Sequence, residues 1–468
     1  MHFIQSLYTL ILNPAYKITC RIDGKIRNAI VLLTCISLAV YFVLFFTEPL
    51  HDYMRRGHTF NSAICSIVLF ILIVFSIKGE LKPVKWNKLV FYLFFLAGLG
   101  VVIISFLHPI GSGYRAWGLL MMFGFPCIYF VWNNRGDYDV LYKRLAAANV
   151  LVGVAFYIYC FIYAANGGQM LEGTRIKCFF YDSNQFSMIG MIMVSCTMYM
   201  LLVNRHSKSW FALTALGFGI GIDIVFLGES RLSILVVAGS LLAFTIYYIK
   251  CGREFHSEKS RSSRWIRAEI LLISLIVFIF AGRAMISINE RAISQSDARV
   301  ASVEIVVPSN VAIPEGSALD RFDTEGQDLN SYTAGRYNIW KNYAQFLNMT
   351  GNDYSKSDWA ALTGNTVKHA HNNFLEIGYR CGVPVAILHT VLELVAGIIC
   401  LIWLFGRKYK EPAYLFAIVF MITYTVQSLF DIATMPFERP APFFFYMAMI
   451  PIFMFGSNKS VEEHKPKH

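Results

Sequence analysis

The sequence predicts an all-α membrane protein with about twelve transmembrane helices and one large loop outside the membrane. Of its 468 residues, 56% are hydrophobic and only 15% are charged, whereas soluble proteins average about 45–50% apolar and about 25% charged residues. The apolar residues are gathered into runs of about 20, the length that crosses a bilayer. One long polar stretch interrupts these runs in the second half of the chain.

Twelve runs qualify as membrane spans by length and composition. They divide the chain into nine spans with short loops over residues 1–287, a large loop over 288–371, and three further spans with a terminal tail over 372–468. The runs cover residues 28–47, 60–77, 88–107, 116–132, 146–165, 184–203, 210–228, 232–249, 268–287, 383–405, 412–430 and 441–456.

The lysine and arginine residues predict the orientation of these spans. Placing the N-terminus in the cytoplasm puts most of the 41 basic residues on the inner side. They include Lys17, Arg21, Lys25, Arg27, Lys78, Lys82, Lys85 and Lys88. We therefore expect both termini in the cytoplasm and the large loop outside. This topology accounts for the net charge of +11 without nucleic acid as a partner.

The N-terminal sixteen residues are apolar but lack the basic start and the small-residue cleavage site of a signal peptide. We expect them to form an interfacial helix on the cytoplasmic face. The ten cysteines are scattered without a CxxC pair, which predicts neither a disulfide framework nor a metal site. The sequence also lacks the phosphate-binding loop of an ATP-driven pump.

The large loop has its own predicted elements. Val303–Val307 is strand-like, and Thr333–Leu347 has the periodicity of an amphipathic helix that Thr333 caps. Its apolar stripe comprises Tyr337, Trp340, Tyr343 and Leu347. A structured loop of this length is typical of a functional one.

Two histidines at the end of this loop are the first candidates for chemistry. His369 and His371 flank one alanine, Asn372 follows, and Gly382 precedes the next span. A histidine titrates near neutrality and can remove a proton from a hydroxyl group as a general base. We assign that role to His371 first and to His369 second, with Asn372 orienting the base or the acceptor. Solvated loop histidines are the alternative interpretation.

Arginines near the outer ends of spans are the second candidates. Arg175 lies in a short outer loop, Arg231 begins a span two residues after Glu229, and Arg336 lies in the first turn of the amphipathic loop helix. The guanidinium fork binds phosphate oxygens at two points. The three arginines therefore fit a lipid-linked diphosphate, although contact with lipid headgroups is the alternative. In the last outer loop, Asp431 and Arg439 could complete an outer site.

Three ionisable residues fall inside predicted spans: Asp223, His389 and Glu393. His389 and Glu393 are four residues apart and so share a helix face. Intramembrane ionisable groups are candidates for proton relays. A hydrogen-bonded pair within the helix bundle is the other interpretation, and we favour it.

These features together resemble the O-antigen ligase/polymerase family. The H-x-H-N segment, followed after nine residues by glycine and a span, is similar to that family's signature. The family's outer-loop arginine, its Ser-Arg at the head of a later span and its Gly-Arg in the large loop look like Arg175, Ser230-Arg231 and Gly335-Arg336. The chain departs from many family ligases at Val385, where they carry glycine, threonine or tyrosine.

The resemblance implies a GT-C-like glycosyltransferase of the bacterial inner membrane, with its active site on the periplasmic face. The donor would be a glycan on undecaprenyl diphosphate, and the acceptor would be lipid A–core or another lipid-linked glycan. The family uses no metal and no cofactor, and inversion at the anomeric carbon is expected.

Two rival interpretations remain at the level of sequence. Within the family, the short outer loops other than the large one favour a ligase weakly over a polymerase. Outside the family, a lipid-linked glycan flippase or another transporter would also have about twelve spans. Transporters commonly carry internal repeats, and the sequence has none that we detect.

Overall fold

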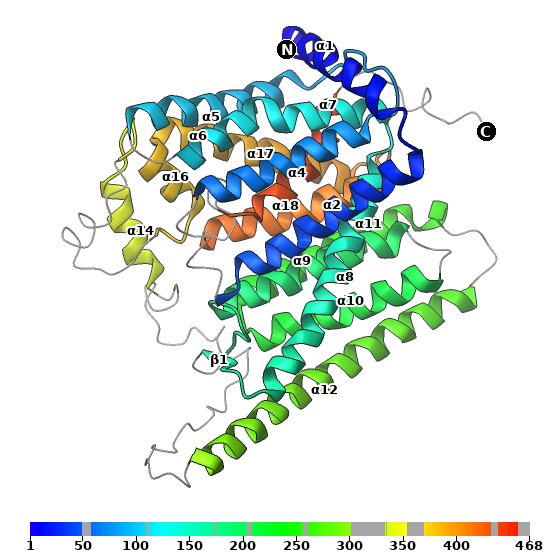
Figure 1. Ribbon diagram of the computed structural model, residues 1–468, viewed down its shortest axis with the longest axis vertical. Coiled ribbons are helices and arrows are strands. Elements are labelled where there is room, and N and C mark those ends of the chain that lie inside the picture. Colours follow the sequence, from blue (N-terminus) through cyan, green and yellow to red (C-terminus); the bar gives the residue numbers. More distant parts are fainter. Residues whose placement is uncertain are drawn as a thin grey trace. The chain divides into compact units, whose positions relative to one another are not determined.

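A computed structural model describes residues 1–48, 58–108, 112–172, 175–203, 208–255, 261–300, 333, 335–352, 369–431 and 439–456. Most of these residues are helical (Figure 1). The chain folds into two compact units. The first comprises Met1–Leu38, Tyr53–Arg144 and Gly326–His468, and the second comprises Ala39–Asp52 and Leu145–Glu325.

The predicted spans are present. Within the described residues, ten helices are long and apolar enough to cross a membrane, and two shorter apolar helices cover Phe60–Ser76 and Pro442–Met454. All twelve coincide with predicted runs, which confirms the all-α polytopic fold class. The ten longer spans are Gly24–Phe45, Lys88–Leu107, Gly113–Arg135, Tyr138–Ala165, Ser183–Val203, Ser209–Leu227, Arg231–Cys251, Glu269–Ser294, Val383–Phe405 and Pro412–Phe430.

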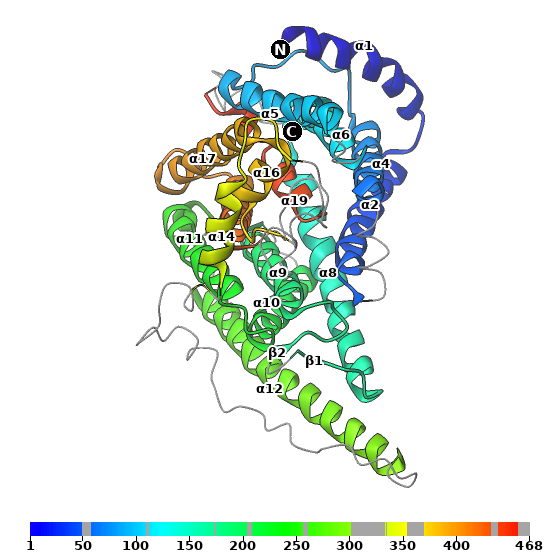
Figure 2. The same ribbon diagram turned by 90° about the vertical axis from the view of Figure 1, so that its left-hand side faces the viewer.

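In the first unit, α5 packs against α6 and α17 (Figures 1 and 2). Where α5 meets α6, a Cβ atom at Gly98 or at Gly118 would lie 2.8 Å from the other residue's carbonyl oxygen. Glycine at both positions lets the two backbones approach closely. The helices of this unit are α1 (His2–Thr19), α2 (Gly24–Phe45), α4 (His58–Ser76), α5 (Lys88–Leu107), α6 (Ser112–Leu119), η1 (Leu120–Gly124), α7 (Phe125–Arg135), α8 (Tyr138–Ala165), α14 (Arg336–Gln345), α16 (Asn373–Cys381), α17 (Val383–Phe405), α18 (Pro412–Phe430), α19 (Pro442–Ala448) and η3 (Ile452–Met454), with α2 and α8 continuing into the second unit.

Helix α1 is attached to the segment that links α4 and α5. The Gln5 side-chain amide donates to the Val84 carbonyl at 3.0 Å and accepts from the Val84 amide at 2.9 Å. Asn13 Oδ1 likewise accepts from the Leu81 amide at 2.9 Å. Because these bonds fix the roll of the helix, its other side stays open and carries exposed Phe3, Leu10, Ile11 and Ile18. This amphipathic form agrees with the predicted interfacial helix.

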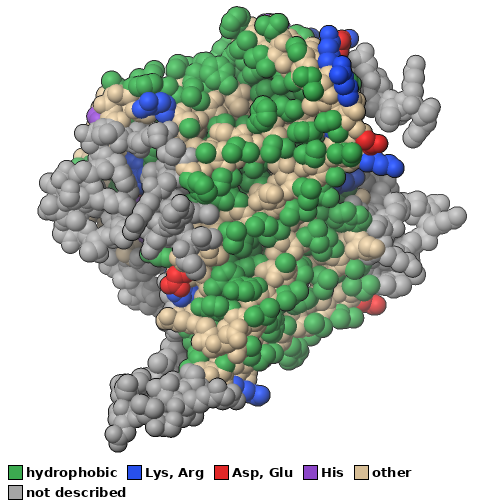
Figure 3. Space-filling view, in the orientation of Figure 1, with side chains coloured by type: hydrophobic (Ala, Val, Ile, Leu, Met, Phe, Trp, Pro, Cys, Tyr) green, Lys and Arg blue, Asp and Glu red, His purple; other side chains and the backbone are tan. Residues whose placement is uncertain are grey.

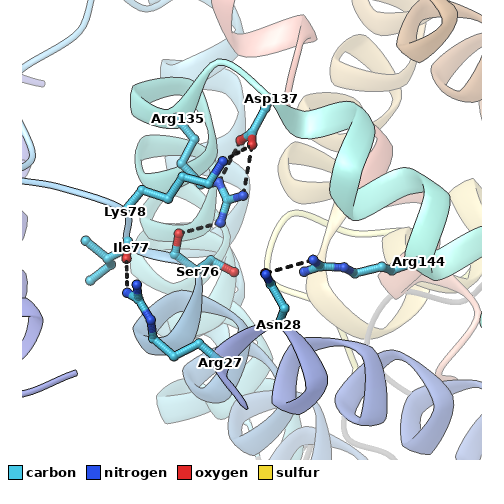
Figure 4. A network of polar contacts seen from close by, with 8 residues as sticks. All are labelled: Arg27, Asn28, Ser76, Ile77, Lys78, Arg135, Asp137 and Arg144. Atoms are coloured by element: carbon cyan, nitrogen blue, oxygen red, sulfur yellow. Dashed lines mark hydrogen bonds and ion pairs between the residues drawn. The ribbon is translucent and has the colours of Figure 1, made fainter. Parts of the chain in front are cut away.

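Basic side chains meet at one end of the first unit (Figure 4). Arg135 contacts the Asp137 carboxylate at two points, 2.7 and 3.0 Å, and Lys78 contacts the same carboxylate. Burial alone would raise the Asp137 pKa, but the hydrogen bonds from Arg135 and Lys78 outweigh it and the pKa lies below its ordinary value. Arg27 donates to the carbonyl of Ile77 at 3.0 Å. The segments before the first span and after the second and fourth therefore share one end, as alternating spans require.

The opposite helix ends of this unit also meet. The Arg380 guanidinium, just before α17, donates to the Tyr114 hydroxyl at the start of α6. The Asn372 side-chain amide donates to the Leu429 carbonyl near the end of α18 at 2.9 Å. Tyr114 lies at the start of span four, just after the loop from span three, and Asn372 and Arg380 lie between spans nine and ten. Leu429 lies near the end of span eleven, just before the loop to span twelve. The histidine segment is thus on the face of the first unit that lies away from the basic end.

In the second unit, α9 packs against α10 and α11, and α10 packs against α12. A Cβ atom at Gly190 would lie 2.5 Å from the Gly221 carbonyl oxygen, so glycine allows α9 and α10 to pack closely. The elements are the antiparallel strands β1 (Leu171–Glu172) and β2 (Arg175–Ile176) and the helices α9 (Ser183–Val203), α10 (Lys208–Leu227), α11 (Arg231–Phe255) and α12 (Arg261–Val300).

The start of the large loop differs from the prediction. Helix α12 continues to Val300, past the predicted end at residue 287, because Asn289–Asp297 contains polar helix formers that a hydropathy pattern excludes. The predicted strand Val303–Val307 lies outside the described residues. The predicted loop helix is present as α14, two or three residues shorter at each end, and the Thr333 hydroxyl accepts from the Tyr337 amide at 3.1 Å.

The described surface is largely apolar. Figure 3 shows hydrophobic side chains over most of the displayed face, with charged side chains at its margins. Such a surface would be a liability in water and matches lipid contact. The protein is therefore a multi-pass membrane protein.

Candidate active site

His369 and His371 lie directly before α16, with their ring centroids 4.0 Å apart. His371 has a backbone φ of 49°, a left-handed conformation that costs a residue with a side chain on the order of 1–2 kcal/mol. Its Nδ1 atom is 3.9 Å from Oδ1 of Asp431, within ion-pair distance but beyond a hydrogen bond. Strained backbone conformations of this kind gather at functional sites.

His369 differs from its neighbour in its protonation. Burial of the ring is the main reason that the pKa of His369 is lowered to about 3, and the His371 charge lowers it further. Asp431 acts in the opposite direction, and Arg439 and Arg380 add to the lowering. The ring is therefore neutral at pH 7, and a base with so low a pKa accepts a proton poorly.

Asn372 has two structural contacts. Its Oδ1 accepts from the Leu375 amide at 3.0 Å and so caps α16. Its Nδ2 donates to the Leu429 carbonyl at 2.9 Å. The side chain therefore positions the turn that contains His371.

Glu376 and Arg380, both on α16, support the histidine segment, and the sequence prediction missed both. They form a buried ion pair four residues apart on α16, with side-chain exposures of 1% and 2%. Glu376 Oε2 also accepts from the Ala370 amide, between the two histidines, at 2.8 Å. Arg380 contacts the Tyr114 hydroxyl. The sequence does carry a signal for this ion pair, because an acidic and a basic residue stand four positions apart just before a span.

The chain returns to the membrane through a close backbone contact. Gly382 has a φ of +86°, and a Cβ atom there would lie 2.5 Å from the Met349 carbonyl oxygen. The Val383 amide donates to the Asn348 carbonyl at 2.8 Å. The Asn348 side chain donates to Asn352 at 2.9 Å. The part of the large loop that directly follows α14 is thus fastened to the start of α17, and the glycine of the predicted motif is required by its conformation.

Arg336 and the helix that it begins belong to the same unit. On α14, Tyr343 is buried with Ala370 between the histidines, and its ring is 5.3 Å from that of Tyr379. Of the predicted stripe, Tyr343 is buried whereas Tyr337 is 43% exposed. Within the part of the chain that the structure describes, the Arg336 guanidinium has no hydrogen-bond partner.

The other two predicted arginines both lie in the second unit. Arg175 Nε donates to the Gly228 carbonyl at 3.0 Å, and its Nη2 donates to Asn184 Oδ1 at 2.7 Å. The neighbouring Glu229 has a φ of 46°, so this turn holds a second strained site residue. Arg231 is the first residue of α11. Arg175 is therefore bonded to the turn that leads into Arg231.

The intramembrane ionisable residues are paired. Tyr157 donates to Asp223 at 2.5 Å in the second unit. In the first unit, His389 Nδ1 and Glu393 Oε1 are 2.9 Å apart, and Ser428 donates to the same carboxylate at 3.2 Å. These contacts agree with the interpretation as hydrogen-bonded pairs inside the bundle.

The structure thus groups the predicted site residues in two sets. One set, in the first unit, holds His369, His371, Asn372 and Asp431, with Arg439 close enough to influence His369. Arg336 lies in the same unit. The other, in the second unit, holds Arg175, Glu229 and Arg231.

The model of the family described as O-antigen ligase matches residues 216–390. The matched segment includes Glu229, Arg231, Arg336, His369, His371 and Asn372 and ends before Asp431 and Arg439. A search of curated proteins finds no match. Over this segment, which contains the histidine motif, the chain is similar to the O-antigen ligase family.

Proposed function

We propose that this protein is an O-antigen ligase, which transfers a glycan from undecaprenyl diphosphate to lipid A–core at the periplasmic face of the inner membrane. The observation that carries the proposal is the pairing of His371, in its strained conformation, with Asp431. A histidine oriented by a carboxylate is a general base for hydroxyl groups. The family match over the histidine segment supports a glycan as the substrate.

In the proposed reaction, His371 removes the proton from the acceptor hydroxyl, and the oxygen of that hydroxyl bonds to the anomeric carbon of the donor. The bond from that carbon to the diphosphate breaks on the opposite side, so the anomeric configuration inverts. Asp431 orients the imidazole and stabilises its positive charge after proton transfer. His369 is the second candidate for the base, and its low pKa favours His371.

Arg231, Arg175 and Arg336 are proposed to bind the diphosphate and to stabilise the charge that grows on it as it leaves. Arginine is suited to this task because its donors fit phosphate oxygens at two points. Glu229 supports Arg231 within the turn. We propose that neither metal nor cofactor takes part.

Deletion of the gene in its host tests the ligase assignment. Surface glycans and carrier-linked glycans are separated on gels. Long polymer that accumulates on the carrier, together with bare lipid A–core, supports a ligase. Single repeats attached to lipid A–core would instead assign the protein as a polymerase, and loss of glycan export without either pattern would favour a transporter.

Complementation of the deletion tests the site. His371→Ala should lower ligation by about 100- to 10,000-fold, the usual contribution of a general base. His2→Ala, at the first residue of α1, is the matched control and should restore normal ligation. A normal ladder with His371→Ala would transfer the role of the base to His369 or to another group.

A further inference from the structure

The loop between α8 and α9 is packed against the last turns of α8 by aromatic rings. The Phe179 ring lies 4.9 Å from that of Phe156, 4.8 Å from that of Tyr159 and 5.7 Å from that of Tyr163. The Phe180 ring is 4.8 Å from that of Phe156. All five residues belong to the second unit. The contacts place the chain immediately before Phe179 on one face of α8.

A cysteine lies on each side of this contact. Cys160 is on α8 between Phe156 and Tyr163, and Cys178 directly precedes Phe179. The two thiols lie close enough to interact with each other. Both are free and have no exposed surface. The fold therefore brings together, in one buried site, a thiol of α8 and a thiol of the loop that follows it.

The backbone fixes the position of Cys178. Its amide and that of Lys177 both donate to the Met170 carbonyl, at 3.1 and 2.8 Å. Cys178 itself has a φ of 53°, so the turn is held in a conformation that a residue with a side chain rarely adopts. Glu48 donates its amide to the Phe179 carbonyl at 3.0 Å. Contacts on both sides of Cys178 thus fix its backbone beside α8.

We propose that Cys160 and Cys178 form a disulfide in the mature protein, which fastens the loop that contains Arg175 to α8. The positive-inside pattern predicts that this loop is outside the cytoplasm, where disulfides form and persist. The thiols are buried in the folded loop, so the bond forms while the loop folds, and burial then protects it from reduction.

The chemistry is thiol–disulfide exchange with an oxidant of the protein-disulfide class. The Cys178 thiolate attacks one sulfur of the oxidant's disulfide and releases the other as a thiolate. The Cys160 thiolate then attacks the Cys178 sulfur and releases the second oxidant sulfur. The oxidant takes up two electrons, and the two protons lost by the cysteines end on its thiols.

The test counts free thiols in the full-length protein. Membranes are prepared without reductant and with N-ethylmaleimide to stop exchange, and a second sample is reduced before labelling. After denaturation, mass spectrometry counts the labelled thiols. The chain has ten cysteines, so eight labels (ten minus two) are expected without reduction and ten after it. Ten labels without reduction would overturn the proposal.

Two variants identify the pair. Cys160→Ser frees its partner, so all nine remaining cysteines should be labelled without reduction. Cys196→Ser removes an equally buried thiol of α9 and should leave seven labelled, because the disulfide remains. If Cys160→Ser also left two cysteines unlabelled, the bond would join other residues and the assignment would be wrong. The readout requires no enzyme activity and stands apart from the proposed reaction.

Discussion

The Glu376 carboxylate contacts Arg380 on one side and the Ala370 amide on the other, and all of these groups are buried. Ala370 is the residue between His369 and His371. One carboxylate therefore connects the position of both histidines to a guanidinium that the Tyr114 hydroxyl holds in turn. The predictions below test this support and the groups around it.

Removal of one member of the ion pair should destabilise the protein strongly. Glu376→Gln leaves the Arg380 charge buried without its counter-charge, a loss of about 3–5 kcal/mol in comparable cases. The double variant Glu376→Leu, Arg380→Met removes both charges and should recover part of the loss. The thermal midpoints of the purified proteins in detergent give the comparison. Equal midpoints for Glu376→Gln and wild type would show that the pair contributes little.

Gly382→Ala should lower the thermal midpoint. The new Cβ would lie 2.5 Å from the Met349 carbonyl oxygen at a φ of +86°, and the conformation alone costs about 1–2 kcal/mol. Gly79→Ala is the matched control, because a Cβ there meets nothing within 4 Å. A drop of similar size in both variants would contradict the structural reason given for Gly382.

The histidine segment should open more easily as the pH falls. The folded pKa of His369, about 3, is below its ordinary value of about 6.5, so the unfolded segment binds the proton more readily. The stability that this difference provides is complete above about pH 6.5 and is lost as the pH falls toward about 3. Hydrogen exchange of peptides from residues 369–381 at pH 7 and pH 5.5, corrected for intrinsic rates, measures the effect.

A His369→Gln variant provides the control for this pH dependence. It has no titrating ring at this position, so the change in protection between the two pH values should shrink. Peptides from α9, which belongs to the second unit, provide a reference for exchange outside the histidine segment. Protection of residues 369–381 that is the same at both pH values in the wild type would contradict the prediction.

Arg231→Lys should reduce transfer if the guanidinium binds the diphosphate at two points. Lysine keeps the charge but loses the fork, and the loss of one such stabilising group raises the barrier by about 2–4 kcal/mol. Arg291→Lys, at an exposed position of α12, is the control. The initial rate of transfer from carrier-linked glycan is measured for both variants. Full activity of Arg231→Lys would refute the two-point contact.

Asp431→Asn should lower transfer less than His371→Ala does. The amide can still contact the His371 ring, but it no longer stabilises a positive imidazole. Rates across pH 5–9 distinguish an electrostatic role from a structural one, because the neutral variant should change the shape of the pH profile. A variant that lowers the rate equally at every pH would show that Asp431 only supports the fold.

The membrane architecture was predictable because the apolar runs dominate it. All twelve runs appear as helices, and the loop helix with its Thr333 contact was visible in the sequence spacing. The prediction of α12 was too short, because a helix that extends beyond the lipid needs no apolar residues. Hydropathy measures burial in lipid, and helix formation does not depend on it.

The site was predictable only in part. His371 and Asp431 were chosen from their place at the outer ends of spans, and the structure brings them together. Their support by Glu376 and Arg380 was not predicted, because a pair at i,i+4 spacing on a short helix usually faces water. Burial of that pair depends on Tyr114, which is far away in the sequence, and no local pattern reports such a contact.

The contacts of Asn372 with Leu429 and of His371 with Asp431 mean that the surroundings of the histidine segment are completed late in the synthesis of the chain. The chain leaves the ribosome from its N-terminus, so the partners of the histidine segment on α6 are made early and those after α18 are made late. A nascent chain arrested before its eleventh span contains the two histidines but neither Leu429 nor Asp431. The histidine segment therefore reaches its full set of contacts only once the late helices are inserted.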